Sequence, residues 1–345
     1  MKKTVTAILA ASALVSMPLK AAAEDMVFAS WGGSYQEAIR KAWMDPFTKA
    51  TGVTVVEDTE PEIARIRGMV DTGAVEWDVV TGGASTVSQG VAYGLFEKIT
   101  DDMVDQSAVI PEARTDYGVP SEIFSTVIGY SKDAFPNGGP QTFADFWDVE
   151  KFPGKRTLPQ KPSTVIEAAL LADGVARADV YKVLATEEGL QRALDKVAEL
   201  KPHVQMWWSS GAQPVQALGA GEVVMALGWN GRFQTGMDEG LNIDMAWGDS
   251  VAQVGYFMLI KDAPNRDAAL KFLNFISKPE QQAEFSKYVA YGPTTPASLP
   301  LIETERLARL PSTEERLANA IFSDMAFWAE HSVAVTEKYN LMMQQ

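Results

Sequence analysis

The stretch of sequence that decides the fold lies at residues 26–56 and reads MVFASWGGSYQEAIRKAWMDPFTKATGVTVV. Its apolar start, residues 26–30, predicts a β-strand. A helix is expected from about Tyr35 to Ala50, with Ser34 in the capping position. Residues 53–56 then predict a second strand. A strand, a helix and a strand joined by short connections are typical of a parallel α/β sheet.

The same alternation continues along the chain. Val79-Val80 predicts a third strand, and Ile123–Tyr130 predicts a longer one that leads into a Gly/Pro-rich loop at 135–140. An α/β fold is therefore expected over most of the chain, whose length is typical of two domains. Beyond the loop we expect an amphipathic helix at 187–200 and strands at 204–206, 223–227, 243–246 and 254–260.

Composition excludes several classes of function. The chain has 345 residues and a formal charge of -15, which argues against a nucleic-acid partner, because nucleic-acid binding needs a basic surface. It has no cysteine, so disulfides, thiol catalysis and iron–sulfur clusters are excluded. With only two histidines, a three-histidine metal site is excluded as well. No nucleophile elbow, zinc-protease motif or P-loop occurs, so we expect no catalytic residues, metal or cofactor.

The N-terminus has the features of an export signal. Lys2 and Lys3 precede an apolar run at 5–15, and the small residues 21–23 provide a cleavage site. The apolar run is about half the ~20 residues needed to span a bilayer. We therefore expect a signal peptide at 1–23, cleaved near Ala23, and an exported protein.

Tryptophan is concentrated after predicted strands. The chain has nine tryptophans, and five of them directly follow a predicted strand: Trp31, Trp207, Trp208, Trp229 and Trp247. In open α/β sheets, ligands bind in the crevice beyond the carboxyl ends of the strands. Several aromatic faces at that edge predict a pocket for an alkyl ammonium or amino-acid-like ligand. The alternative is that each tryptophan only covers an edge of a sheet.

Three motifs carry a resemblance to a known family. Trp31-Gly32-Gly33-Ser34-Tyr35 follows the first strand, Trp229-Asn230-Gly231 follows a later one, and Tyr291-Gly292-Pro293-Thr294 comes near the end. Together they resemble periplasmic solute-binding proteins of ABC importers, most closely the spermidine/putrescine-binding group, which also includes γ-aminobutyrate-type binders. The resemblance implies a small-molecule solute held in a cleft between two hinged lobes, a membrane permease as partner, and no reaction.

The resemblance also implies the fold and the boundaries of its lobes along the chain. It is the two-lobed periplasmic-binding-protein fold (type II), an α/β fold in which each lobe is a mainly parallel sheet flanked by helices, with hinge crossings between the lobes. We expect the first lobe at 24–130 and about 258–325, the second at 131–257, and a C-terminal helix packing on the lobes at 326–345. A monomer located in the periplasm is expected.

Eight ligand-binding residues follow from matching the family positions, and a ninth follows from its chemistry. Five would supply aromatic contacts and three polar contacts, and Arg232 is added because its planar guanidinium suits a carboxylate. The expected residues are Trp31, Trp229, Trp247, Tyr256 and Tyr291 for aromatic contacts, Ser34, Ser85 and Thr86 for polar contacts, and Arg232.

The sequence departs from the polyamine-binding pattern. Polyamine binders resemble one another in placing acids at three positions, and this chain has none at 161–164, none at 253–256, and Arg232 after its Trp-Asn-Gly motif. A dication beside Arg232 would be unfavourable. We therefore expect a small solute with a carboxylate and an amino group, with Asp249 or Glu57 as candidate partners of the amine. A salt bridge from Arg232 to Asp238 or Asp249 is the alternative.

Other readings stay open at this point. One is a polyamine binder whose acids come from Glu60 or Glu62. Another is a secreted hydrolase that uses the carboxylate pair Asp101-Asp102. A tyrosine-based metal-ion binder is less favoured, since Tyr130 and Tyr291 are isolated and no Tyr-Tyr pair occurs.

Overall fold

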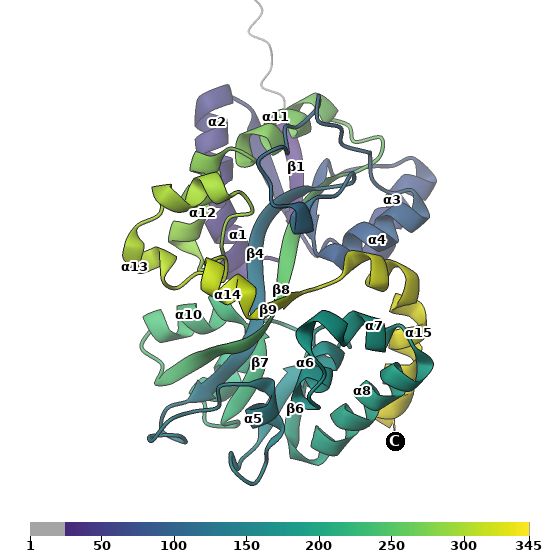
Figure 1. The fold of residues 1–345 in the computed structure, drawn as a ribbon. Helices are drawn as coiled ribbons and strands as arrows, with labels where there is room; N and C mark the ends of the chain where they lie inside the picture. Colours follow the sequence, from purple (N-terminus) through teal and green to yellow (C-terminus); the bar gives the residue numbers. More distant parts are fainter. Residues whose placement is uncertain (1–24, 345) are drawn as a thin grey trace, which may run out of the picture.

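The computed structural model describes residues 25–344, so the expected signal peptide at 1–23 lies outside the described residues. A nine-stranded sheet runs through the molecule and helices cover both of its faces (Figure 1). The strands are β1 (Asp25–Ser30), β2 (Thr54–Thr59), β3 (Val79–Gly82), β4 (Val119–Ser131), β5 (Arg156–Pro159), β6 (Val204–Trp208), β7 (Met225–Trp229), β8 (Ile243–Leu259) and β9 (Ala320–Phe322).

The helices follow the strands in the order expected of an α/β protein, and the helix expected at 187–200 is confirmed with both ends. In residues 25–344, no helix is both long and apolar enough to cross a membrane. The helices are α1 (Gly33–Ile39), α2 (Asp45–Thr51), α3 (Ile63–Thr72), α4 (Ala84–Tyr93), α5 (Phe143–Trp147), α6 (Val165–Ala172), α7 (Val180–Leu184), α8 (Glu187–Leu200), α9 (Gln213–Gly219), α10 (Asn230–Asp238), α11 (Arg266–Ile276), α12 (Pro279–Tyr288), α13 (Thr304–Leu307), α14 (Glu314–Ala318) and α15 (Met325–Gln344).

The strand order is β2-β1-β3-β8-β4-β7-β5-β6, and β9 pairs with β8. β1 is parallel to both β2 and β3, which confirms the parallel unit predicted from residues 26–56. β5 is parallel to β6 and β7 in the same way. The α/β fold class is therefore confirmed.

We call the β2-β1-β3 section with α1–α4, α11 and α12 the first lobe, and the β7-β5-β6 section with α5–α10 the second lobe. The boundaries of the lobes along the chain stay a prediction.

Two long antiparallel strands join the lobes. One end of β8 pairs with β3 through Tyr256–Leu259, and the neighbouring end of β4 pairs with β8 there. The other end of β4 pairs with β7 through Thr126–Tyr130. The two strands expected at 243–246 and 254–260 are thus one strand. The stretch between them, 247–250, interrupts the apolar pattern in the sequence. In the structure it lies at a register shift, where Thr126 and Ile128 of β4 pair with Val251 and Ala246.

The beginning of α1 differs from the prediction. Ser34 is not the cap, because the helix begins at Gly33, two residues before the expected start at Tyr35, and Gly32 occupies the capping position. Gly32 and Gly33 have φ values of 65° and 60°, which glycine adopts without the steric cost of a side chain. The Gly32 amide donates to Gln36 Oε1 at 3.0 Å, and no side chain caps the first turn of the helix. Ser34 is thereby left free for a contact outside its own helix.

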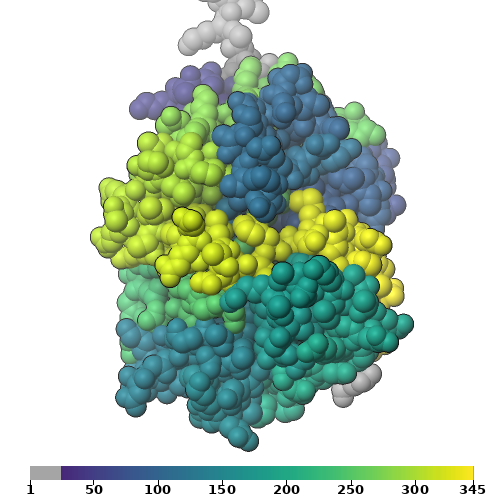
Figure 2. All heavy atoms as spheres, viewed as in Figure 1, coloured from purple at the N-terminus to yellow at the C-terminus, as the bar shows by residue number. Residues whose placement is uncertain are grey.

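The C-terminal helix α15 contacts both lobes. It packs against α4 of the first lobe and α8 of the second. Trp328 Nε1 donates to Glu167 Oε1 at 3.1 Å, and Lys201 Nζ donates to the Met343 carbonyl at 2.8 Å. Figure 2 shows the C-terminal segment, in yellow, as a band across the boundary between the upper and lower parts. The C-terminal segment therefore covers this side of the boundary.

One buried side-chain amide, that of Asn230, links β4 to a segment of the first lobe. Asn230, at the start of α10, is fully buried; its Oδ1 accepts from the Ser125 amide of β4 at 2.9 Å, and its Nδ2 donates to the Ala290 carbonyl at 2.6 Å. We expect Asn230→Ala to lower the free energy of unfolding by about 3 kcal/mol, because it strands a buried donor and a buried acceptor. Urea denaturation measures this. Asn242→Ala, at an exposed asparagine, is the control, and equal effects of the two changes would contradict the assignment.

A second buried group predicts a pH dependence of stability. Burial raises the pKa of Glu167 to about 7, although Tyr181 and Trp328 donate to its carboxylate. Because the folded-state pKa lies above the ordinary value, ionisation favours the unfolded chain, and stability is lost as the pH rises toward 7. Glu167→Gln keeps an acceptor oxygen without the charge. We expect it to raise the free energy of unfolding by about 2 kcal/mol at pH 8 and hardly at pH 4.5. Thermal denaturation at the two pH values tests this, and an equal gain at both would contradict it.

Candidate functional site

The carboxyl ends of strands from both lobes face one another. β1 ends at Ser30 and β3 at Gly82, and α1 and α4 begin directly after them. β7 ends at Trp229, opposite Thr126 of β4, and α10 follows. Because β3 and β7 each pair antiparallel with one of the long joining strands, their carboxyl ends both point to the middle of the sheet. Ligands bind at such edges in α/β sheets, so this boundary is the candidate site.

Arg232 crosses the boundary. Its Nη1 donates to Ser34 Oγ at 2.5 Å, which joins the first turn of α10 to the first turn of α1. Its Nε is buried and has no hydrogen-bond partner. A cation at the N-terminal end of a helix is opposed by the helix dipole, so both the dipole and the unpartnered Nε favour an anion here.

The salt bridges considered for Arg232 are not formed. Asp238 pairs with Arg309 at 3.2 Å, and Asp249 pairs with Arg177 at 2.6 Å. Within residues 25–344 Arg232 has no ion-pair partner. The alternative interpretation of this residue is therefore wrong, because each candidate acid already holds another arginine.

A row of aromatic rings runs from the first lobe to the second. Tyr35 and Tyr291 lie 6.2 Å apart between ring centroids, and Tyr291 and Phe124 lie 5.4 Å apart. Phe124 meets Trp229 edge to face at 5.9 Å, and Trp229 meets Trp208 at 5.4 Å. Tyr291 also packs on Gly231, where an added Cβ would lie 2.5 Å from the ring. Trp229 and Tyr291 are thus held on either side of Phe124, close to Arg232.

A buried acid that the sequence analysis did not single out lies at the same edge. Glu122 of β4 is 2% exposed, and its Oε1 accepts from Tyr35 Oη at 2.7 Å. Tyr35 Oη also lies 3.3 Å from Thr81 Oγ1, at the end of β3. Burial raises the pKa of Glu122 to about 7 and that of Tyr35 well above its usual range. The available signal was a single acid beside the apolar run, one residue before the expected strand start at Ile123.

The remaining expected residues lie in varied surroundings. Trp31 is 46% exposed at the end of β1, and Ser85 Oγ accepts from Gln89 at the start of α4. The Trp247 ring is covered by the Arg316 guanidinium at 4.0 Å, and Tyr256 is 1% exposed in the core under α3 and α4. Thr86 packs on Gly82. The structure thus brings together Ser34, Trp229, Arg232 and Tyr291; the binding role of each of the nine stays a prediction.

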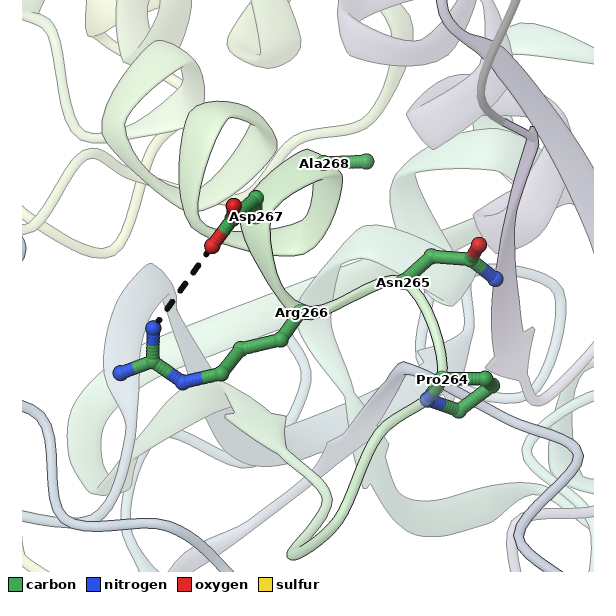
Figure 3. A pocket seen from close by; sticks show the side chains of 5 residues that line it. All are labelled: Pro264, Asn265, Arg266, Asp267 and Ala268. Carbon is green, nitrogen blue, oxygen red and sulfur yellow. Dashed lines mark ion pairs between the residues drawn. The ribbon is translucent and has the colours of Figure 1, made fainter.

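The hollow drawn in Figure 3 lies elsewhere. It has a volume of about 240 Å³ and is lined by residues 264–268 at the start of α11. Of its two charged groups, Arg266 is paired with Glu97 at 2.6 Å and lies 3.8 Å from the other, Asp267. Asn265 is bonded to Asp78, just before β3, so this hollow is at the amino end of that strand, away from the candidate site. No cluster of acidic or histidine side chains suited to a metal ion occurs in residues 25–344.

Comparison with known proteins places this geometry in a family. Residues 42–312 match the family described as bacterial extracellular solute-binding protein. The chain is 36% identical to the gamma-aminobutyric acid-binding protein of Pseudomonas aeruginosa over 93% of this chain and 91% of that one. It is 25% identical to the spermidine/putrescine-binding periplasmic protein of Escherichia coli over 88% of each. It is 38% identical to the binding protein MotA of A. tumefaciens B6, solved in complex with glucopine, with a TM-score of 0.87 and coverage of 92% and 99%.

These matches decide between two classes of function. The relatives are solute-binding proteins and not enzymes, so the secreted-hydrolase alternative is wrong. The family match covers most of both lobes and the strands that join them. The chain belongs to the bacterial extracellular solute-binding proteins.

Proposed function

We propose that this protein captures a small solute with a carboxylate and an amino group, such as γ-aminobutyrate, and delivers it to the permease of an ABC importer. It works as an exported monomer in the periplasm, after removal of its signal peptide near Ala23, and has no nucleic-acid partner. The observation that carries the proposal is Arg232, with its unpartnered, buried Nε at the start of α10 and its Nη1 on Ser34 of the other lobe.

A carboxylate fits the surroundings of Arg232. The guanidinium offers a planar fork that binds a carboxylate with two parallel hydrogen bonds. Ser34, which already bonds Nη1, supplies a hydroxyl at the same point. Trp229 and Tyr291 flank the position and suit the apolar chain of a short amino acid. Because the anion would contact groups of both lobes, its binding favours their closure.

The relatives support an amino-acid-like ligand over a polyamine. The relative at 36% identity is a gamma-aminobutyric acid-binding protein, whereas the spermidine/putrescine-binding relative is 25% identical. An unneutralised arginine at the site also opposes a dication, because burying like charges together is costly. Glu60 and Glu62, proposed for a polyamine, lie on the surface next to the first turn of α3.

A ligand panel tests this proposal. The chain from Glu24, refolded to remove carried-over ligand, is heated with γ-aminobutyrate, longer ω-amino acids, α-amino acids, putrescine or spermidine. At about a hundred times Kd we expect an amino acid to raise Tm by about 5 °C, because a ligand that binds only the folded state stabilises it. A shift with putrescine or spermidine alone would replace the proposal with the polyamine alternative.

Two variants separate charge recognition from packing. Arg232→Ala should weaken γ-aminobutyrate by about 2 kcal/mol or more, the usual effect of removing one partner of a buried charge pair. Trp229→Ala should abolish the binding of every ligand in the panel while the chain stays folded, because it removes the aromatic wall. Calorimetric titration measures both. Arg309→Ala, an exposed arginine that pairs with Asp238 at the boundary, is the control and should change Kd less than twofold. Unchanged affinity in Arg232→Ala would leave that residue without a role in binding.

A further inference from the structure

The second charge of the candidate site is Glu122. We propose that Glu122 receives the ammonium group of the solute while Arg232 receives its carboxylate, so that the site selects ω-amino acids, in which the two charges are separated by several bonds. This inference rests on the proposed function and names the group that answers the amine. Asp249 and Glu57, considered from the sequence, are both engaged elsewhere: Asp249 with Arg177, and Glu57 with Arg40 and Gln36.

Strand pairing brings the Glu122 carboxylate to this position. Glu122 pairs with Gly255 of β8, just past the carboxyl end of β3. A Cβ added to Gly255 would lie 2.1 Å from Glu122 Oε1, so the carboxylate fills the space that a side chain at 255 would occupy. Strand β8 has no acid at 253–256, and its partner strand provides one at the same place. The glycine is therefore a requirement for the position of the carboxylate.

Glu122 and Arg232 both act on Tyr291, and Glu122 Oε2 and Arg232 Nε are not bonded to each other. Burial raises the pKa of Tyr291 to about 12, while Arg232 acts to lower it and Glu122 to raise it. Adjacent residues of α1 each contact one of the charges: Ser34 bonds Arg232, and Tyr35 bonds Glu122. The carboxyl and guanidinium groups therefore contact neighbouring residues of one helix without pairing, an arrangement that suits a ligand whose ammonium and carboxylate are several bonds apart.

Both charged groups have unused hydrogen-bonding capacity. Glu122 Oε2 is buried without a partner, and so is Arg232 Nε. An unsatisfied buried polar atom is costly, and an isolated buried charge more so. A zwitterion with a spaced ammonium and carboxylate would satisfy both atoms at once. A monoamine or a monocarboxylate would satisfy only one of them.

The same geometry makes binding depend on pH. The groups that face Glu122 are Tyr35 of α1, Ser121 of its own strand and Tyr291, and Tyr35 Oη in turn lies 3.3 Å from Thr81 Oγ1 of β3; Gly255 of β8 adds no charge. The two tyrosines have raised pKa values, so they stay neutral below pH 9. Glu122, with a pKa of about 7, gains its charge between pH 5.5 and 7.5. An ammonium ligand should therefore bind more tightly as the pH rises through this range.

The test compares γ-aminobutyrate with butyrate, which has the same chain and carboxylate and no ammonium. Glu122→Gln keeps an acceptor for Tyr35 and removes the charge. We expect this variant to lose at least thirtyfold in affinity for γ-aminobutyrate and less than threefold for butyrate, measured by calorimetric titration at pH 7.5. Arg232→Ala should weaken both probes. Between pH 5.5 and 7.5 the wild-type Kd for γ-aminobutyrate should fall at least tenfold, and the Kd of Glu122→Gln should stay constant.

A rescue variant distinguishes a loss of affinity caused by the missing charge from one caused by misfolding. Glu122→Gly combined with Gly255→Asp supplies the carboxylate from β8 and should recover most of the lost affinity for γ-aminobutyrate; it also serves if Glu122→Gln does not fold. Equal losses for both probes, with no rescue, would make Glu122 a structural residue and overturn the inference. Unchanged binding of γ-aminobutyrate by Glu122→Gln would do the same and leave the proposed function intact. Wild-type protein that binds neither probe nor any ω-amino acid would refute the proposed function itself.

Discussion

The pairing of β4 with β8 is the constraint on which the rest of the structure depends. These strands continue from one lobe into the other, so each lobe is built onto the same two pieces of chain. Their antiparallel ladder fixes the direction of the strands beside it, and therefore directs the carboxyl ends of β3 and β7 toward the same boundary. It also fixes Glu122 opposite Gly255. A change of register by one residue would turn Glu122 to the other face of the sheet.

Electrostatics explains why the proposed site favours a ligand with two opposite charges. A buried carboxyl with an unpartnered oxygen and a guanidinium with a buried, unpartnered Nε are each unfavourable alone. The raised pKa of Glu122 reflects this cost, because burial disfavours the charged form of the carboxyl. A ligand with both charges removes the cost on both sides. Affinity then comes from groups that the fold has already desolvated and positioned.

Local structure was predictable where the signal is local. The helix Glu187–Leu200 has a threonine cap at Thr186, acids in its first turn and Pro202 after its end, so both limits were found. Prediction was wrong where a distant residue determines the contact that a side chain makes. Ser34 has the sequence context of a helix cap, but its hydroxyl instead accepts from Arg232, 198 residues away. Glu122 was missed for the same reason, since its importance comes from pairing with β8 and not from its neighbours in sequence. The motifs Trp229-Asn230-Gly231 and Tyr291-Gly292 indicated the boundary, but the role of Asn230 in tying β4 to Ala290 depends on the packed structure.

The C-terminal segment determines which kind of lobe motion the fold allows. β9 pairs in parallel with residues 250–252 of β8, next to the register shift where the ladder with β4 is interrupted. Beyond β9, α15 packs on α4 and then along α8, so one continuous piece of chain contacts both lobes on this side of the boundary. Sliding the lobes past each other would break the contacts of α15 with one of them. Bending beside β9, where the ladder is already irregular, requires no slip of β4 along β8. The closure of the lobes that we propose is therefore expected to be a hinge rather than a shear.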